Sequence, residues 1–305
     1  MKTDIVVLGS LNVDFVVRTR KRPKSGETVL GTDFRIYPGG KGANQAVAAA
    51  RAGGKVAMAG RVGDDIFAGI LTESLTGAGV NTDLVKVTGG VSTGSAFITI
   101  DETGENSIVV VPGANYRCDR KDVDDLWPAL SAAKVLLLQL EIPLDTVIYA
   151  AQKAHSLGVT VMLDPAPATH LPPEIFSLID IITPNEHEAS FLTGREICDT
   201  KSARLGALEL LSMGVKAAVI KLGGKGLVYG EKDYFDHIPG HKVDVVDTTA
   251  AGDAFSGGLA VAICEGKSLG EACRFANAVA ALSVTRVGAQ TSMPWREEID
   301  RFLNA

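Results

Sequence analysis

A stretch of small residues in the C-terminal third of the chain has the composition of a phosphoryl-binding site. It reads Val246-Asp-Thr-Thr-Ala-Ala-Gly-Asp-Ala-Phe-Ser-Gly-Gly258, and we expect a strand over Lys242–Val246 and then a helix that begins at about Ala251 or Gly252. Small side chains let backbone N–H groups converge at the positive end of a helix dipole, which favours an anion such as a phosphoryl group. These N–H groups belong to Ala250, Ala251, Gly252 and Asp253.

Asp253 would lie in the first turn of this helix, beside the anion site. A carboxylate there could accept the proton of a hydroxyl group that attacks the phosphoryl group. The alternative is that Asp253 only complements the helix N-terminus. Taken alone, this stretch favours the alternative.

A glycine-rich segment, Pro38-Gly-Gly-Lys-Gly-Ala-Asn44, precedes another expected helix. Its glycines allow close backbone approach and positive φ angles, and Lys41 and Asn44 can donate to hydroxyl or phosphoryl oxygens. The segment is not a Walker A loop, because the pattern Gly-x-x-x-x-Gly-Lys-Ser/Thr is absent here and at residues 223–226. A structural turn is the alternative.

Asn12 and Asp14 follow the first expected strand, in Gly9-Ser-Leu-Asn-Val-Asp14. Side chains two residues apart on an extended chain face the same way, and an amide beside a carboxylate can hold two neighbouring hydroxyl groups. Ligands of parallel sheets bind beyond the carboxyl ends of the strands. As an isolated pattern, a turn is the alternative.

Two further segments have polar residues at expected strand ends. In Thr183-Pro-Asn-Glu-His-Glu188, the side chains of Asn185 and Glu188 would share a helix face and offer the oxygen ligands that Mg²⁺ prefers. A helix N-cap with a capping-box glutamate explains the same pair, and both interpretations can hold. The turn Lys221-Leu-Gly-Gly-Lys-Gly-Leu227 joins two strands and could lie against a nucleotide, although hairpin turns look similar.

The elements that must position these residues alternate along the chain. Short apolar strands separated by helices of ten to fourteen residues predict an α/β fold, a mostly parallel sheet with helices on both faces. Strands are expected over Asp4–Leu8, Lys55–Val62, Lys134–Leu140, Val159–Leu163, Ile179–Thr183 and Lys216–Leu222. Helices are expected over Ala43–Ala52, Phe67–Gly77, Leu144–Leu157, Lys201–Met213, Ala251–Glu265, Leu269–Thr285 and Pro294–Leu303.

Two regions, residues 12–38 and 91–111, read as strands without intervening helices. The second contains a hairpin pattern around Glu102-Thr-Gly-Glu-Asn106. We interpret these strands as a small projecting sheet, a lid formed by about residues 12–40 and 91–113 of a single domain that spans residues 1–305. Extra edge strands of the main sheet are the alternative.

Composition excludes several classes of protein. The net charge is −6 over 305 residues, and no long run of Lys or Arg exists, so a nucleic-acid surface is not expected. No apolar run of about 18 residues is present, so we expect no membrane span and a cytoplasmic location. The four cysteines lack zinc spacing and are typical of idle thiols in a reducing compartment; they are Cys118, Cys198, Cys264 and Cys273.

The motifs Gly39-Gly-Lys-Gly-Ala-Asn44 and Asp247-Thr-Thr-Ala-Ala-Gly-Asp253 lie about 210 residues apart. With them the chain resembles the ribokinase family of sugar kinases, from Val6 to Pro294-Trp-Arg-Glu-Glu-Ile-Asp300. Two departures stand out: Ala250 replaces the first glycine of the family pattern Asp-Thr-x-Gly-Ala-Gly-Asp, and Lys221 stands where relatives often carry Thr.

The resemblance implies a Rossmann-like core with a β-sheet lid, and a homodimer formed through the lids. It implies a sugar site made by Asn12, Asp14, Gly40, Lys41, Asn44, Ala96, Val110, Glu141 and Asp253. It implies a nucleotide site made by Asn185, Lys221, Gly223, Gly226, Gly252 and Asn277, with Glu188 near Mg²⁺. It implies a K⁺ site made, mostly through carbonyls, by Asp247, Thr249, Ser283, Arg286, Gly288 and Ser292.

The activity that the resemblance implies is transfer of a phosphoryl group from ATP to O5 of D-ribose, with Asp253 as the base and ribose 5-phosphate and ADP as products. The nearest alternative is a kinase of 2-deoxyribose, of a ketohexose or of a nucleoside. A non-catalytic sugar-binding regulator is less favoured, because Asp253 and the Asn185/Glu188 pair are retained. A nicotinamide-dependent dehydrogenase is disfavoured, because no Gly-x-Gly-x-x-Gly follows a strand.

Overall fold

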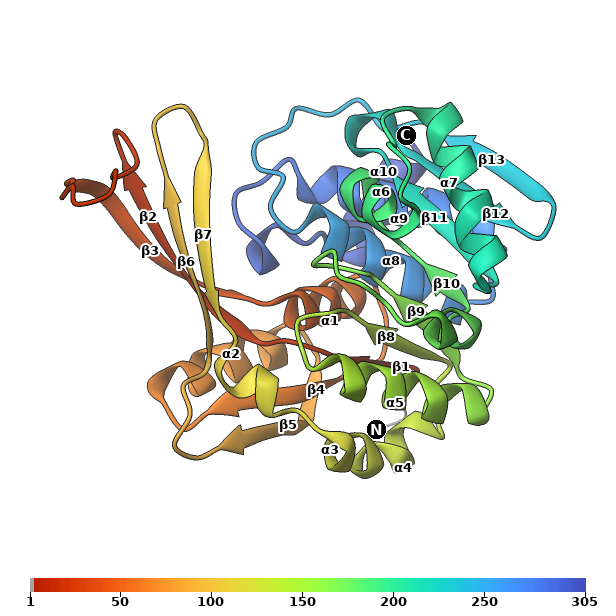
Figure 1. Ribbon diagram of the computed structural model, residues 1–305, viewed down its shortest axis with the longest axis horizontal. Helices are drawn as coiled ribbons and strands as arrows, with labels where there is room; N and C mark the ends of the chain where they lie inside the picture. The colour runs from red at the N-terminus through yellow and green to blue at the C-terminus, as the bar shows by residue number, and fades with distance from the viewer. Residues whose placement is uncertain (1–2) are drawn as a thin grey trace.

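The computed structural model describes residues 3–305 and contains two sheets. The larger sheet has nine strands in the order β13-β12-β11-β10-β9-β8-β1-β4-β5, and its pairs are parallel except β11–β12 and β12–β13 (Figure 1). Its strands are β1 (Ile5–Leu8), β4 (Val56–Gly63), β5 (Asn81–Thr88), β8 (Val135–Leu138), β9 (Thr160–Leu163), β10 (Ile181–Ile182), β11 (Ala217–Lys221), β12 (Leu227–Glu231) and β13 (Tyr234–Ile238).

Helices cover both faces of this sheet, because its central strands are apolar on both sides. In β1, Ile5 and Val7 belong to one buried cluster, whereas Val6 and Leu8 belong to the other. The first cluster lies under α1 (Lys41–Arg51), α2 (Ile66–Gly77), α8 (Ala251–Cys264), α9 (Leu269–Ser283) and α10 (Arg296–Leu303). The second lies under α3 (Arg120–Asp125), α4 (Trp127–Leu130), α5 (Leu144–Ser156), α6 (Glu186–Thr193) and α7 (Thr200–Met213).

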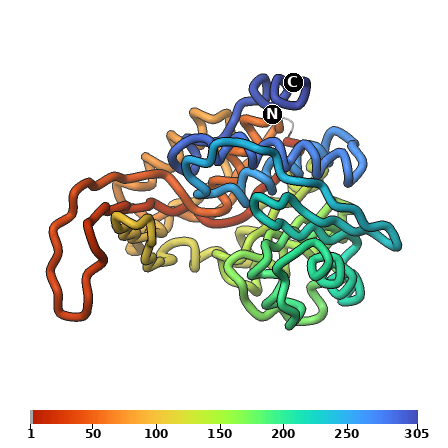
Figure 2. The backbone as a smooth tube through the Cα atoms, turned by 90° about the horizontal axis from the view of Figure 1, so that it is seen from above, coloured from red at the N-terminus to blue at the C-terminus, as the bar shows by residue number. Residues whose placement is uncertain are grey.

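The smaller sheet is the expected lid, and the alternative of extra edge strands on the main sheet is wrong. Its four strands pair in the order β3-β2-β6-β7 and stand beside the body (Figure 1), with the β2–β3 hairpin projecting from it (Figure 2). They are β2 (Asn12–Thr19), β3 (Gly31–Gly39), β6 (Gly94–Ile100) and β7 (Asn106–Val111). β2 follows β1 after only three residues, so the first lid strand is joined closely to the main sheet.

One expected strand is wrong. Residues 242–246 have no regular structure, and the side chains of Val245 and Val246 are 62% and 58% exposed. The N–H groups of Val246 and Asp247 both donate to the carbonyl of Val284, after the end of α9. This segment is therefore hydrogen-bonded to a helix end rather than to a neighbouring strand. Its two valines are exposed and are not covered by a partner strand.

Candidate active site

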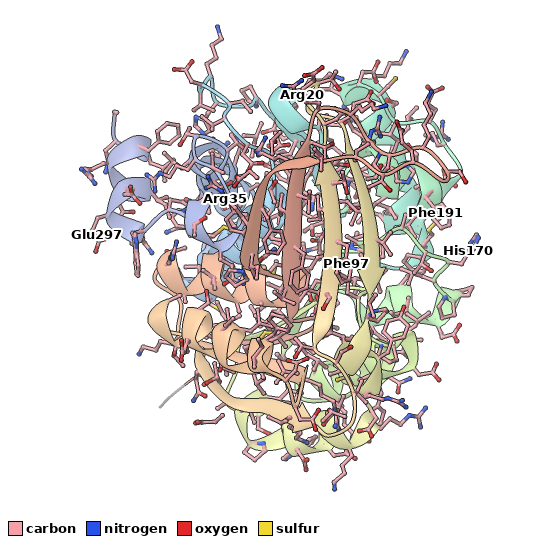
Figure 3. The ribbon with its side chains drawn as sticks, turned by 90° about the vertical axis from the view of Figure 1, so that its left-hand side faces the viewer. Arg20, Arg35, Phe97, His170, Phe191 and Glu297 are labelled. Carbon is pink, nitrogen blue, oxygen red and sulfur yellow. The ribbon has the colours of Figure 1, made fainter. Side chains whose placement is uncertain are left out.

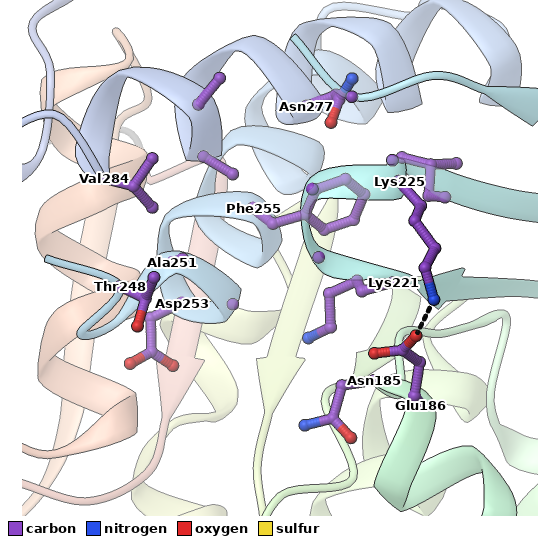
Figure 4. Close-up of a pocket in the computed structure, with 18 of the residues that line it drawn as sticks. Asn185, Glu186, Lys221, Lys225, Thr248, Ala251, Asp253, Phe255, Asn277 and Val284 are labelled. Atoms are coloured by element: carbon purple, nitrogen blue, oxygen red, sulfur yellow. Dashed lines mark ion pairs between the residues drawn. The ribbon is translucent and has the colours of Figure 1, made fainter. Parts of the chain in front are cut away.

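Polar residues noted in the sequence converge at the carboxyl-end edge of the main sheet, together with Asp164, which was not noted. Asp164 follows β9, Asn185 follows β10, and Lys221 ends β11, where it bridges to Asn185. The N-terminus of α8 lies over this edge, so that Asp253 lines the same cavity as these residues (Figure 4). Parallel strands bring their carboxyl ends to one edge, which is why residues far apart in the sequence meet here.

Asp253 is held in one orientation within a buried environment. Its side chain accepts from Asn44 Nδ2 on one oxygen and from Gln45 Nε2 on the other, both at 3.0 Å, and the residue is only 5% exposed. Burial raises the pKa of Asp253 to about 6, although the ammonium group of Lys41 opposes this shift. A fixed carboxylate with a raised pKa is suited to accept a proton near neutral pH.

The helix that carries Asp253 begins with strained backbone. Ala250 is the N-cap of α8 and has φ 58° and ψ 18°, in the left-handed region that non-glycine residues rarely adopt. Position 250, where the family pattern has glycine, therefore has a backbone conformation that glycine adopts more easily than alanine. Ala250, Ala251 and Gly252 line the cavity. The N–H group of Ala251 donates to the carbonyl of Thr248 at 3.2 Å, whereas those of Gly252 and Asp253 have no partner among the described residues.

Lys41 lines the cavity from the start of α1. Burial by itself would lower the pKa of Lys41, but the carboxylates of Asp253 and Asp164 raise it above its usual range. Gly40 precedes it with φ 88°, and a Cβ atom there would lie 2.6 Å from the backbone nitrogen of Asn12. Only glycine allows this close approach between α1 and the first lid strand.

The lid brings Asp14 toward the same point. Burial, together with the charges of Glu141 and Asp253, raises the pKa of Asp14 to about 7. Strand register aligns Asp14 with Ala96 on β6, and Ala96 with Val110 on β7, so these three residues occupy one row of one lid face. The structure therefore brings together three of the lid residues that were assigned to the sugar.

Glu141 and Asn44 complete this side of the site. Glu141 Oε2 accepts from Ser10 Oγ at 2.5 Å and from the backbone nitrogen of Lys41 at 3.2 Å. Asn44 Oδ1 is buried and has no hydrogen-bond partner among the described residues. A buried acceptor without a partner is costly, so a hydroxyl donor from a ligand would relieve it.

A cavity of about 1070 Å³ lies on the other side of Asp253. Of the residues assigned to the sugar, only Lys41 and Asp253 line it, so the cavity and the lid side meet at these two. Its wall includes every residue assigned to the nucleotide, as well as the one assigned to Mg²⁺: Asn185, Glu188, Lys221, Gly223, Gly226, Gly252 and Asn277.

Asn185 and Glu188 form the capping box that was one interpretation of the pair. Asn185 Oδ1 accepts from the backbone nitrogen of Glu188, and Glu188 Oε2 accepts from that of Asn185, both at 2.8 Å. Burial and the charge of Asp164 raise the pKa of Glu188. The capping interpretation is confirmed, and the magnesium interpretation stays a prediction.

Comparison with known proteins agrees with this arrangement. The profile of the pfkB family carbohydrate kinases matches residues 2–296. The chain belongs to this family. It is 44% identical over 303 residues to the ribokinase of Haemophilus influenzae, covering 99% of both chains, and 37% identical over 302 residues to the deoxyribokinase of Salmonella typhi, again covering 99% of both.

A solved structure is similar over the whole length of this pfkB-family chain. It is that of Arabidopsis thaliana ribokinase complexed with ribose and ATP, which is 36% identical, with a TM-score of 0.93 and full coverage of both chains. The chain is therefore a carbohydrate kinase with the ribokinase fold.

Sequence reasoning missed four polar residues of this kinase site. Gln45 Nε2 donates to Asp164 Oδ2 at 2.8 Å, and Asn115 Nδ2 donates to Asn12 Oδ1 at 2.7 Å. The fourth residue, Ser10, donates through Oγ to Glu141. Asp164 had a usable signal, since an acidic residue before a proline directly follows a buried strand. Gln45 lies next to Asn44, just after the noted glycine-rich segment, and carried no separate signal.

The residues assigned to K⁺ lie in two neighbouring segments, the loop before α8 and residues 283–292, which begin at the last residue of α9. Asp247 Oδ1 accepts from Thr249 Oγ1 at 2.6 Å, and Asp247 Oδ2 accepts from the backbone nitrogen of Gly288 at 2.9 Å. Burial by itself would raise the pKa of Asp247, but the hydrogen bonds from Thr249 and Gly288 lower it below its ordinary value. The side chain of Arg286 instead pairs with Glu298, and the hydroxyls of Ser283 and Ser292 bond to nearby carbonyls.

Proposed function

We propose that the chain transfers the γ-phosphoryl group of ATP to O5 of D-ribose, which gives ribose 5-phosphate and ADP. The observation that carries this proposal is the buried Asp253 carboxylate, which stands where the cavity of about 1070 Å³ meets the lid side of the site. The named activities of its relatives, and the ribose and ATP named with the Arabidopsis structure, support the choice of substrates.

In the reaction, Asp253 accepts the O5 proton of the sugar as O5 bonds to the γ-phosphorus. The bond between that phosphorus and the β,γ-bridging oxygen breaks, and its electron pair leaves with ADP. The N–H groups at the start of α8 stabilise the charge on the transferring group. Closure of the lid would exclude water, which otherwise competes as the acceptor.

The sugar is proposed to lie between the lid row and the start of α1. Asp14 and Asn12 would hold two neighbouring hydroxyl groups, and the unpartnered Asn44 Oδ1 would accept from another. A site built around hydroxyl partners discriminates against a sugar that lacks one of them. We therefore favour ribose over 2-deoxyribose, although a deoxyribokinase is among the relatives.

Two cations are part of the proposal. Mg²⁺ would bind through water near Glu188, whose buried carboxylate offers oxygen ligands and whose orientation is held by Asn185. When bound, Mg²⁺ neutralises charge on the phosphate oxygens.

K⁺ would bind between the Asp247 loop and residues 283–292, which are hydrogen-bonded to each other. The donor set is entirely oxygen, from one carboxylate, three hydroxyl-bearing residues and backbone carbonyls, which suits an alkali cation. A cation there would hold the loop that leads into α8 without touching the sugar.

A homodimer is proposed through the outer lid face. Phe15, Phe34 and Phe97 stack there, with centroid distances of 6.4 and 5.1 Å from Phe15, and Figure 3 shows Phe97 on the face turned away from the body. Phe34 and Phe97 are 57% and 50% exposed, so this apolar face is only partly covered in the single chain, where Phe15 contacts Phe67 of α2 edge-on. A second copy presents the same face, so the two lids can cover each other.

A cytoplasmic location is proposed because the reaction consumes ATP and because the four cysteines, all within the described residues, are free thiols. No helix within residues 3–305 is long and apolar enough to cross a membrane. Neither nucleic acid nor membrane is proposed as a partner.

The test is ADP release from ATP and Mg²⁺ with a panel of ribose, 2-deoxyribose, fructose and adenosine, with and without K⁺. The expected result is the highest kcat/KM for ribose, with stimulation by K⁺. Preference for another acceptor would overturn the ribose assignment, and sugar binding without any ADP release would favour a regulator.

A further inference from the structure

Lys221 is linked to the catalytic carboxylate by a buried chain of hydrogen bonds. Its Nζ atom donates to Asp164 Oδ1 at 2.9 Å, and 14% of the Lys221 side chain and 3% of that of Asp164 are exposed. Asp164 Oδ2 accepts from Gln45 Nε2 at 2.8 Å, and the same nitrogen donates to Asp253 Oδ1 at 3.0 Å. Gln45 Oε1 accepts from Gln139, so the donor side of its amide must face the two carboxylates.

Lys221 also lies beside the anion site of α8. A Cβ atom added to Gly252 would stand 3.3 Å from Lys221 Nζ, and the side chain extends from β11 toward the Asp253 side of the cavity (Figure 4). An ammonium group has three N–H donors. Among the described residues only Asp164 accepts from it, which leaves two donors for a ligand.

We propose that Lys221 is a catalytic residue that donates to the transferring phosphoryl group, and that Asp164 is a positioning residue that holds its ammonium group there. This inference rests on the proposed phosphoryl transfer and deepens it. The N–H groups of α8 supply only partial charges, whereas Lys221 adds a full positive charge beside them. In an enclosed site such a preorganised charge stabilises the oxygens of the transferring group.

A purely structural role for Lys221 makes a different prediction. A buried carboxylate that loses its partner destabilises the protein, whereas removal of both charges of a buried pair is often tolerated. If Lys221 only neutralised Asp164, removal of the Asp164 charge would make the lysine dispensable. The double variant Asp164→Asn/Lys221→Met therefore separates the two roles, because the asparagine that replaces Asp164 still offers an oxygen to Gln45.

The experiment compares Lys221→Met, the double variant and Lys216→Met with the wild type. Lys216 is a matched control, because it adjoins the opposite end of β11 and pairs with Asp180 at 2.5 Å. We expect Lys221→Met to lower kcat about a hundredfold with little change in the KM for ribose. The double variant should recover the melting temperature but keep the low kcat, and Lys216→Met should keep the wild-type kcat.

Recovery of near-wild-type kcat by the double variant would overturn the proposal. The double variant also provides the test if Lys221→Met alone fails to fold. Calorimetry with ADP and with the non-hydrolysable analogue AMP-PCP gives a second measurement. Lys221→Met should lose affinity for AMP-PCP but not for ADP, and equal losses would contradict contact with the transferring group. This binding result stands even if the wild type does not phosphorylate ribose, so the two proposals can fail separately.

Discussion

At the scale of single residues, the site depends on carboxyl groups whose pKa values are set by burial. Asp253 accepts two amide hydrogen bonds and lies next to Lys41, yet desolvation still raises its pKa to about 6. Asp14, on the lid, has a pKa raised to about 7. Such shifts gather at functional sites because the enclosure that excludes water also disfavours charge.

Asp253→Asn removes the proton acceptor and keeps the shape of the side chain. We expect kcat to fall at least about a hundredfold, the usual scale for a positioned base, while ribose binding measured by calorimetry changes little. In the wild type, kcat should decline as the pH falls through about 6, because the protonated form of Asp253 cannot accept a proton. Near-full kcat in the variant would exclude Asp253 as the base.

Asp14→Asn tests a conflict between binding and stability. The folded-state pKa of Asp14 is about 7 against an ordinary 3.8, so ionised Asp14 destabilises the fold, and the cost grows as the pH rises from 3.8 to 7. The variant should therefore raise the melting temperature of the sugar-free protein more at pH 8 than at pH 5. It should also raise the KM for ribose, because an amide replaces the carboxylate. A stability gain that is equal at both pH values would contradict the raised pKa.

At the scale of elements, the start of α8 combines strain with function. Ala250 adopts φ 58° in the turn that begins α8, at the wall of the cavity. The left-handed conformation costs an alanine roughly 1–2 kcal/mol. The packing of α8 against α1 and α9 offsets this cost.

Ala250→Gly should relieve this strain. Because glycine loses more backbone entropy on folding, we expect a net gain of at most about 1 kcal/mol in the free energy of unfolding, measured by urea denaturation, with kcat unchanged. Ala250→Val is the opposite change and should destabilise the protein and lower kcat, since a β-branched side chain is more restricted there. A glycine variant that is less stable than the wild type would show that the turn is not strained.

At the scale of the whole molecule, the lid has two different faces. The row that contains Asp14, Ala96 and Val110 faces the site, whereas the stacked phenylalanines lie on the other face. Alternation along each strand makes this division possible, because successive side chains point to opposite sides of a sheet. One sheet can thus close over a sugar and pair with a second copy.

Phe97→Asp places a charge in the proposed dimer interface and should yield monomers in sedimentation experiments. Phe191→Asp is the matched control, because Phe191 is also partly exposed but lies on α6, away from the lid (Figure 3). We expect the control to keep the wild-type oligomeric state. A Phe97 variant that sediments like the wild type would rule out a dimer that depends on this face.

The sequence by itself determined the architecture and most of the candidate site. Apolar runs of strand length and helical periodicity are local patterns, so they predicted β1, β9, α5 and α8 almost to the residue. The small residues around Gly252 indicated an anion site from their own neighbours, whereas the glycines near Lys41 were equally explained by a turn until the family resemblance was considered. The strand expected over 242–246 failed because two exposed valines found no partner strand.

Only the tertiary structure decided how the polar groups interact. The bond from Gln45 to Asp253 joins residues 208 positions apart, and that from Lys221 to Asp164 joins residues 57 apart. Likewise, the raised pKa of Asp14 depends on burial and on carboxylates from other parts of the chain. Hydrogen bonds and electrostatic shifts follow distance and desolvation, which arise only once the elements have packed.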